Sequence, residues 1–160
     1  MTMRRHDKEI VSREEIDAVI READVCRLGL AFNNEPYVVP ISFGYDGAAI
    51  YIHTAPKGRK IEFFAANTRV CFELEAHVEI RADAEKACDW TFTFESVVGH
   101  GSITELTGED DKIDGLNHIM RHYSGREWAF ASKDLATTRV WRIEIESVTG
   151  KRSAKKSPGS

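Results

Sequence analysis

The sequence of 160 residues lacks most of the features that assign a chain to a class at first sight. It contains three cysteines and no CxxC pair, which argues against a disulfide framework and for a reducing compartment, so we expect a cytoplasmic protein. No apolar run approaches the length of a membrane span, and no apolar segment follows the charged start of the chain as in a signal peptide. The net charge of −4 provides no basic excess for nucleic acid. Membrane and nucleic-acid partners are therefore not expected.

Common catalytic and nucleotide-binding signatures are absent as well. There is no GxSxG, no Walker loop and no GxGxxG. Ser96 lies in the sequence ESVVG, which lacks the first glycine of a nucleophile elbow. His118 and His122 have a spacing that can bind zinc from one helical face, but no third ligand is evident, so we favour two surface histidines and predict no metal site.

The apolar content is sufficient for one core. Hydrophobic residues make up 42% of the chain, and its length fits a single domain. The last ten residues are polar and include four basic ones. We predict one domain over residues 1–150 and a disordered tail over residues 151–160.

The hydrophobic pattern alternates between the periods of helices and strands. Ser12 and Glu15 form a capping box ahead of a helix predicted for residues 13–23, and further helices are predicted to begin near Lys57 and Thr107. A period of two predicts strands over residues 26–32, 37–43, 50–54, 69–75, 90–105 and 138–147, with a charged loop over 79–89. Short hairpins dominate this order. We therefore predict a mainly β fold of six antiparallel strands in a small closed or split barrel, with flanking helices.

One turn and three single residues refine this topology. Residues 33–35 (NNE) predict a turn between the first two strands. Pro40 cannot donate to a ladder, so its strand has a free edge or a bulge there. Gly99 and Gly101 predict bends or close backbone approach within one long strand.

The most informative stretch is HTAPKGRK, residues 53–60. It leaves a strand, turns at Pro56 and enters a helix whose first amides carry partial positive charge. Lys57, Arg59 and Lys60 add three cations there, and Gly58 allows a ligand to approach the backbone closely. Cations at a helix N-terminus are unfavourable unless an anion accompanies them. The stretch therefore indicates a phosphate site, with a solvated basic turn as the alternative.

Two further segments could contact a ligand. Residues 39–45 (VPISFGY) combine backbone amides, a hydroxyl and aromatic rings, against which a flat heterocycle could lie. Taken alone, such a segment is more simply a half-buried strand. Trp141 in the last strand either fills the core or covers a ring bound by a second chain, and both interpretations stay open.

Several short motifs follow one another along the chain in the order that is typical of one protein family. They are, from the N-terminus, residues 3–5 (MRR), 25–28 (VCRL), 39–47 (VPISFGYDG), 52–55 (IHTA) with 58–60 (GRK), 70–73 (VCFE), 95–101 (ESVVGHG), 119–125 (IMRHYSG) and 149–151 (TGK). In this set the chain resembles the flavin-binding split barrels of the pyridoxamine 5'-phosphate oxidase-like superfamily. Within that superfamily it resembles the nitroimidazole-resistance (Nim) branch.

The resemblance implies a split barrel that forms a homodimer, with FMN bound between two copies, and a small-molecule substrate. It also implies a catalytic or orienting role for His53. The cofactor-binding residues that it implies are Pro40, Ile41, Ser42 and Phe43 along the flavin ring, His53, Thr54, Ala55, Lys57, Gly58, Arg59 and Lys60 toward the phosphate, and Ser96, Val97 and Trp141 around the pocket. Lys60 ranks above Arg59 and Lys57 as the phosphate ligand.

Three functions are compatible with these residues. The leading one is an FMN-dependent oxidoreductase that reduces nitro compounds such as 5-nitroimidazoles, in which the flavin carries the electrons. The second is a protein that binds flavin or haem without turnover, and the third is a relative that uses a deazaflavin. The chain is shorter than true pyridoxamine 5'-phosphate oxidases and lacks their C-terminal substrate-phosphate segment, which argues against oxidation of vitamin B6.

Overall fold

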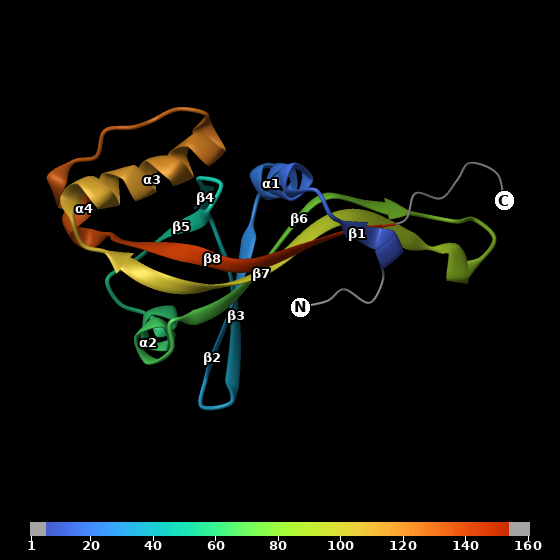
Figure 1. Cartoon of the computed structure of the whole chain (residues 1–160), viewed down its shortest axis with the longest axis horizontal. Helices are drawn as coiled ribbons and strands as arrows, with labels where there is room; N and C mark the ends of the chain where they lie inside the picture. The colour runs from blue at the N-terminus through green and yellow to red at the C-terminus, as the bar shows by residue number, and fades with distance from the viewer. Residues whose placement is uncertain (1–5, 154–160) are drawn as a thin grey trace.

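The computed structural model describes residues 6–153 (Figure 1). Residues 154–160 of the tail predicted over 151–160 and the MRR motif at residues 3–5 lie outside them. The elements in chain order are η1 (His6–Lys8), β1 (Glu9–Ile10), α1 (Arg13–Glu22), β2 (Cys26–Phe32), β3 (Glu35–Ile41), β4 (Gly44–Tyr45), β5 (Ala49–Thr54), α2 (Arg59–Ala66), β6 (Arg69–Arg81), η2 (Ala87–Asp89), β7 (Thr91–Leu106), α3 (Glu109–Ser124), α4 (Ser132–Thr137) and β8 (Arg139–Arg152).

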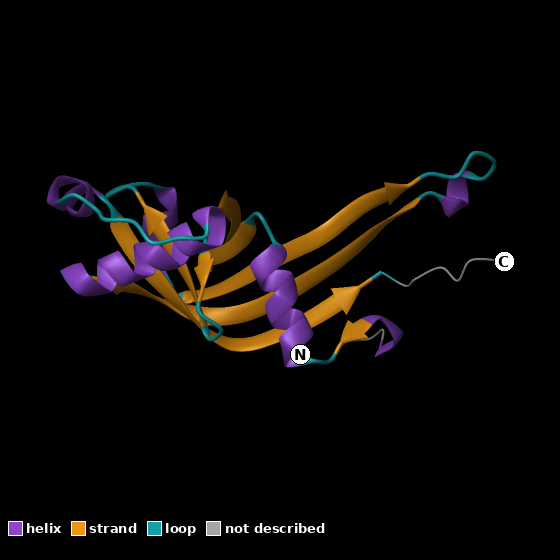
Figure 2. Cartoon of the chain, turned by 90° about the horizontal axis from the view of Figure 1, so that it is seen from above, coloured by secondary structure: helices purple, strands orange, loops and turns teal. Residues whose placement is uncertain are grey.

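All strand pairs are antiparallel and belong to one sheet. The strand order is β3-β2-β6-β7-β8-β5-β4, and β1 pairs with β8 beside this path. The sheet curls without closing, with α1 and α3 on one side of the long strands and α2 on the other (Figures 1 and 2). The predicted split barrel with flanking helices is therefore confirmed. The six predicted strands are present, and the two-residue strands β1 and β4 add to them.

The hairpin of β2 and β3 is tighter than predicted. Asn33 and Asn34 both have positive φ, 50° and 62°, which asparagine tolerates better than most residues. Their two-residue turn lets Glu35 pair directly with Phe32, so β3 begins at Glu35 instead of residue 37. Strand β3 forms one end of the sheet, as the prediction for Pro40 required.

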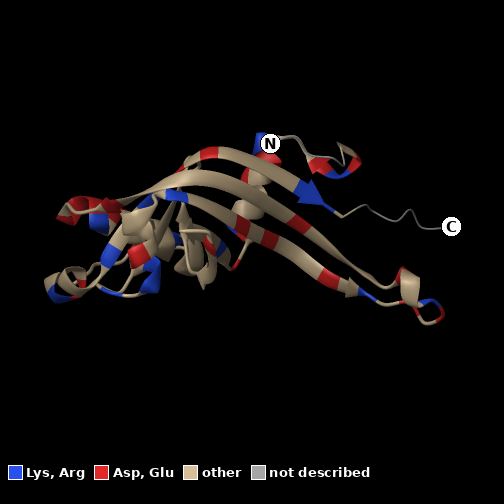
Figure 3. Cartoon of the chain, turned by 90° about the horizontal axis from the view of Figure 1, so that it is seen from below, with Lys and Arg blue, Asp and Glu red and all other residues tan. Residues whose placement is uncertain are grey.

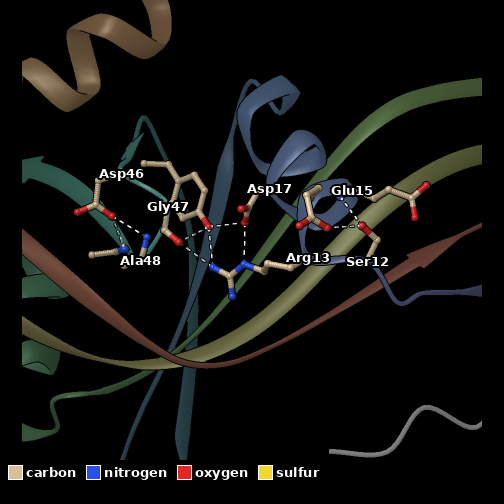
Figure 4. A network of polar contacts seen from close by, with 10 residues as sticks. Ser12, Arg13, Glu15, Asp17, Asp46, Gly47 and Ala48 are labelled. Carbon is tan, nitrogen blue, oxygen red and sulfur yellow. Dashed lines mark hydrogen bonds and ion pairs between the residues drawn. The ribbon is translucent and has the colours of Figure 1, made fainter.

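A polar network ties α1 to the turn between β4 and β5 (Figure 4). Asp46 accepts from the amides of residues 48 and 49, both at 2.7 Å. Arg13 donates to the carbonyl of Gly47 at 2.8 Å and to the hydroxyl of Tyr45, which itself donates to Asp17 at 2.7 Å. Burial, followed by the bond to Asp17, raises the pKa of Tyr45 to about 12. The tyrosine is thus a neutral structural link at physiological pH.

The capping box of α1 is only half formed. Ser12 accepts from the amide of Glu15 at 3.4 Å, as predicted. The Glu15 carboxylate does not reach back, because Arg152 of β8 binds it at 2.8 Å. Strand β8 runs to Arg152, with Lys151 opposite Ser96 and Arg152 opposite Glu95. Residues 151 and 152, predicted as tail, therefore belong to the sheet, because the long β7 provides a partner that far along.

Strands β6 and β7 extend beyond the barrel as a two-stranded arm (Figure 2). Their pairing shifts register between Ala76 and Glu79 and resumes with Ile80 opposite Phe92. Part of the predicted loop over residues 79–89 is therefore strand, since cross-strand pairing overrides its polar composition. Val78, Ile80, Trp90 and Phe92 are each half exposed or more on this arm.

Close backbone contacts explain several glycines. A Cβ at Gly99 would lie 2.1 Å from the ring of Phe72, and one at Gly101 would lie 2.2 Å from the carbonyl oxygen of Glu144. The approach predicted at both positions is thus confirmed. A Cβ at Gly44 would lie 2.3 Å from the backbone of His118, which shows that α3 rests directly on β4.

Replacing Gly44 should test this helix-to-strand contact. In Gly44→Ala the methyl group would meet the backbone of α3, so the helix must shift, and we expect the free energy of unfolding to fall by about 1–3 kcal/mol. Urea denaturation measures the loss. Gly29→Ala is the matched control, because its Cβ would make only an ordinary contact of 3.4 Å, and it should leave the free energy of unfolding within about 0.5 kcal/mol. Equal effects of the two substitutions would contradict the contact.

Candidate functional site

The turn between β5 and α2 has the geometry of an anion site. Gly58 occupies the N-cap position with φ 148°, a conformation that L side chains rarely adopt, and no side chain caps the helix there. A Cβ at Gly58 would have no heavy atom within 4 Å, so the backbone at this point is open to solvent. The first amides of α2 therefore face an accessible space with the positive end of the helix dipole.

The three cations of this turn are not equivalent. Arg59 forms an ion pair with Glu35 of β3, and its guanidinium lies 5.2 Å from the centroid of the Tyr37 ring. Its charge is thus already compensated. Within residues 6–153, neither Lys57 nor Lys60 forms an ion pair. In the view of Figure 3, both acidic and basic positions are scattered over the helices and the long strands. The two lysines are therefore the cations of this turn that remain unpaired within residues 6–153, whereas Arg59 is paired with Glu35.

A buried hydrogen bond anchors the start of the turn. Thr54 is 4% exposed and accepts from the indole nitrogen of Trp141 at 3.0 Å. Trp141 packs against Phe64 of α2, with ring centroids 5.0 Å apart. Trp141 therefore fills the core of its own chain, which is the first of the two interpretations given above. Its contribution to the site is indirect, through the position of Thr54.

Arg139 and Glu105 reinforce this anchor, and sequence reasoning missed both. Arg139 lies opposite Thr54 in the sheet, binds Glu105 through two nitrogens and lies 4.6 Å from the Trp141 ring centroid. It also donates to the carbonyl of Pro56 at 3.4 Å, in the turn itself. Alternation along the last strand puts Arg139 on the same face as Trp141. Only the register of β7 with β8 brings Glu105 beside them.

The predicted ring-lining segment divides between two faces. Ile41 and Phe43 are buried in the core, and Phe43 packs under His122 with ring centroids 4.4 Å apart. Pro40 and Ser42 are exposed, as expected from the alternation of a strand. Side-chain contact with a ligand is thus open to Pro40 and Ser42. Ile41 can offer only its backbone, and Phe43 only its carbonyl, because the Phe43 amide donates to the hydroxyl of Tyr123 at 3.2 Å.

His53 lies on the outer face of β5, between the buried residues Ile52 and Thr54. Its side chain reaches solvent, and Ala55, the next residue but one, is also exposed. Desolvation by the surrounding protein lowers the pKa of His53, and the positive charge of Lys60 lowers it further. The imidazole is therefore neutral at pH 7 and can both donate and accept a hydrogen bond.

Ser96 and Val97 are not brought to this turn within one chain. They lie in β7 nine or more residues from Leu106, which pairs with Val140, the residue opposite His53. At a rise of about 3.3 Å per residue this is about 30 Å along the strand. Val97 is fully buried in the core and Ser96 is half-buried.

The two histidines of α3 have structural partners. His118 stacks on Tyr51, with ring centroids 4.4 Å apart, and His122 bonds to the carbonyl of Ala23 at 2.8 Å. Among residues 6–153 there is no group of three or more side chains that could hold a metal ion. No helix in this part of the chain is long and apolar enough to cross a membrane.

Comparison with known proteins gives a consistent picture. The family model described as pyridoxamine 5'-phosphate oxidase matches residues 12–152. An uncharacterized protein of Rhizobium meliloti (strain 1021) is 32% identical over 65 residues, which are 41% of this chain and 42% of that protein. The match thus spans less than half the length of this curated relative.

Solved structures share the fold. A protein from Bacteroides thetaiotaomicron, provisionally described as a 5-nitroimidazole antibiotic resistance protein, has a TM-score of 0.80 and 28% identity, covering 90% of this chain and 86% of that one. A FAD-binding protein from Mesorhizobium loti has a TM-score of 0.67 and 27% identity, covering 92% and 99%. The FAD and heme binding protein from Mycobacterium smegmatis, with a TM-score of 0.81 and 19% identity over 96% and 77%, shows the fold alone.

The pKa of His53 should respond to Lys60. NMR titration of the ring protons should give a pKa below 6.5, and Lys60→Met should raise it without restoring 6.5, because desolvation is the larger cause. Since the unfolded chain takes up this proton at higher pH than the folded chain, the contribution of His53 to stability is present above pH 6.5 and is lost as the pH falls below it. Lys57→Met is the control and should leave the pKa of His53 unchanged. A wild-type value above 6.5 would refute the assignment.

Thr54→Val should show how much the buried hydrogen bond from the Trp141 indole contributes to the free energy of unfolding. Valine keeps the shape but leaves the Trp141 nitrogen without an acceptor, so we expect a loss of about 1–3 kcal/mol in the free energy of unfolding. Thr104→Val, at an exposed position of β7, is the matched control and should cost little. Denaturant unfolding of both variants measures the difference, and a neutral Thr54→Val would mean that the bond is not formed.

Proposed function

The chain belongs to the pyridoxamine 5'-phosphate oxidase family, and from this premise we propose that it is an oxidoreductase that binds the FMN unit of a flavin at the turn between β5 and α2. The observation that carries the proposal is the uncapped N-terminus of α2, open at Gly58 and flanked by two lysines without an ion-pair partner in the described chain. A phosphate there would accept hydrogen bonds from the helix amides and neutralise Lys57 and Lys60.

The remaining predicted residues have separate roles under this proposal. The flavin, when bound, supplies the electron transfer. Pro40 and Ser42 would lie along the ring through their exposed side chains, and Ile41 and Phe43 through backbone groups. His53, neutral at pH 7, would orient a small-molecule substrate or hold a proton for it. Thr54 would fix the turn through its bond to Trp141.

We further propose that two copies of the chain assemble around the cofactor. Pro40, Ser42 and His53 are all exposed on one chain, whereas ligand sites bury most of a ligand of this size. A second copy would cover the ring and exclude water from it. The three free cysteines support a reducing, cytoplasmic location for such a dimer.

The substrate class that we propose rests on the relative with 28% identity. That protein is provisionally described as a resistance protein for 5-nitroimidazole antibiotics, and we propose nitro compounds of this type as substrates here. Reduction of a nitro group requires a donor of electrons, which the bound flavin would provide. FMN-loaded protein that is photoreduced under argon with EDTA as the electron donor should therefore be re-oxidised on addition of a 5-nitroimidazole. A flavin that stays reduced would show binding without this activity.

Flavin binding itself is tested by removing the cations of the turn. Lys57→Ala combined with Lys60→Ala should weaken FMN binding at least about tenfold, since each loses a charge-assisted contact to the phosphate. Arg59→Ala should change the affinity less than about threefold, because Glu35 already neutralises that residue. Fluorescence titration of flavin-free protein with FMN measures the affinity of the wild type, the double lysine variant and Arg59→Ala. Lys86→Ala, in the distant loop of the arm, is the matched control.

Two results would overturn this proposal. The first is wild-type protein that binds no FMN. The second is an affinity that depends on Arg59 and not on the two lysines.

A further inference from the structure

A hollow of about 260 Å³ lies between α1 and α3. It is lined by Arg21 of α1, Tyr45 of β4, and His118, Arg121 and His122 of α3. Both helices lie on one side of the long strands, whereas α2, which follows the proposed phosphate turn, lies on the other (Figures 1 and 2). The roles proposed above for residues around a flavin use none of these five side chains.

The lining contains two arginines and no acidic side chain. Arg21 and Arg121 each lie in the last turn of a helix, where a cation complements the negative end of the helix dipole. This accounts for each arginine on its own helix. It does not account for two guanidinium groups that line the same hollow, because their like charges repel each other. An anion between them would remove this repulsion.

Arg21 is available to bind such an anion. Within residues 6–153 its guanidinium forms no hydrogen bond or ion pair, and its Cζ lies 5.3 Å from the centroid of the Tyr45 ring. Asp17 lies four residues earlier on α1, at the spacing of a helical ion pair. Its carboxylate, however, already accepts from Arg13 at 2.8 Å and from Tyr45 at 2.7 Å. The N–H donors of Arg21 are therefore open to a ligand.

Arg121 is oriented by its neighbours but only weakly compensated. It donates to Nδ1 of His118 at 3.2 Å, which fixes the guanidinium at the wall of the hollow. Its carboxylate partners, Glu127 at 2.9 Å and Asp114 at 3.7 Å, are not part of the lining, and their side chains are 65% and 62% exposed. Ion pairs this exposed contribute little to stability, so a bound dianion can compete with them for Arg121.

The walls of the hollow are held in place by contacts within the chain. Nε2 of His122 donates to the carbonyl of Ala23, the C-cap of α1, at 2.8 Å, which ties α3 directly to α1. His118 stacks on Tyr51 of β5, with ring centroids 4.4 Å apart. A ligand would therefore not have to order the two helices, and this lowers the free-energy cost of binding.

We propose that this hollow binds the phosphate group of a small molecule, either as free phosphate or as a phosphate monoester. A phosphate dianion matches two guanidinium groups, because it carries two charges and several acceptor oxygens that arginine can bind through paired N–H groups. A carboxylate would neutralise only one of the two arginines. The site is distinct from the turn at Gly58, and the inference does not rest on the proposed flavin binding.

NMR titration of the wild-type protein with inorganic phosphate tests the inference. At about pH 7.5 and constant ionic strength, the ring protons of His118 and His122 should shift and reach saturation, whereas chloride should leave them unchanged. A parallel titration with glycerol 2-phosphate distinguishes the two sources of the phosphate group. The source that binds more tightly identifies the ligand class, and either order supports the site.

Replacing the two arginines should weaken binding. Arg21→Gln and Arg121→Gln should each raise the dissociation constant of phosphate at least about fivefold, since each removes a charge-assisted contact. Arg126→Gln is the matched control, because this arginine packs over Trp128 outside the hollow and its replacement changes the net charge equally. Glu127→Gln should tighten binding about two- to threefold, because it releases Arg121 from a competing carboxylate.

Phosphate at the turn before α2 is recognised separately, by shifts of the amides of residues 58–60. Lys57→Ala combined with Lys60→Ala should remove those shifts and leave the histidine shifts intact. The inference is overturned if the histidine ring protons do not respond to phosphate, or if their response persists when both arginines of the hollow are replaced by glutamine. Neither result affects the proposed flavin binding, and a failure of FMN to bind leaves the phosphate site between α1 and α3 unaffected.

Discussion

Strand β8 is hydrogen-bonded along both of its edges, and the arrangement of the site depends on this. It pairs with β7 on one side and with β5 and β1 on the other. The double pairing places Arg139 between Thr54 and Glu105 and presses Trp141 against Phe64 of α2. The turn that follows β5 therefore leaves the sheet from a fixed point. A loop that is to hold an anion with its amides, as we propose for this turn, needs such support because its own residues form few contacts.

The different surroundings of Lys57, Arg59 and Lys60 follow from the same packing. Helix α2 lies between the turn and the β2–β3 hairpin, so residues on its two sides face different neighbours. Arg59 meets Glu35 and the ring of Tyr37, whereas Lys60 influences the pKa of His53 on β5. A cluster that is uniform in the sequence is thus split into a compensated arginine and two available lysines.

Much of the fold could be predicted from local sequence, and less of the site. Period-two alternation located all six main strands. The turn predicted for residues 33–35 was one residue too long, because Glu35 already pairs with Phe32. The ends of β6 and β8 could not be predicted, because long-range pairing with β7 extends them through polar residues. The role of Glu105 was hidden for the same reason, since it depends on the register with Trp141. Val97 was named as a site residue from the family resemblance, and within one chain its side chain is buried in the core.

The arm formed by the ends of β6 and β7 has a consequence for handling the protein. Four large apolar side chains, Val78, Ile80, Trp90 and Phe92, are each half exposed or more on a two-stranded ladder. In the described part of the chain, residues 79–81 of β6 pair only with β7, which leaves their other edge free to accept a strand. This short ladder is therefore open to edge-to-edge pairing with another chain. A lysine at the position of Ile80 would raise the concentration at which the protein stays clear.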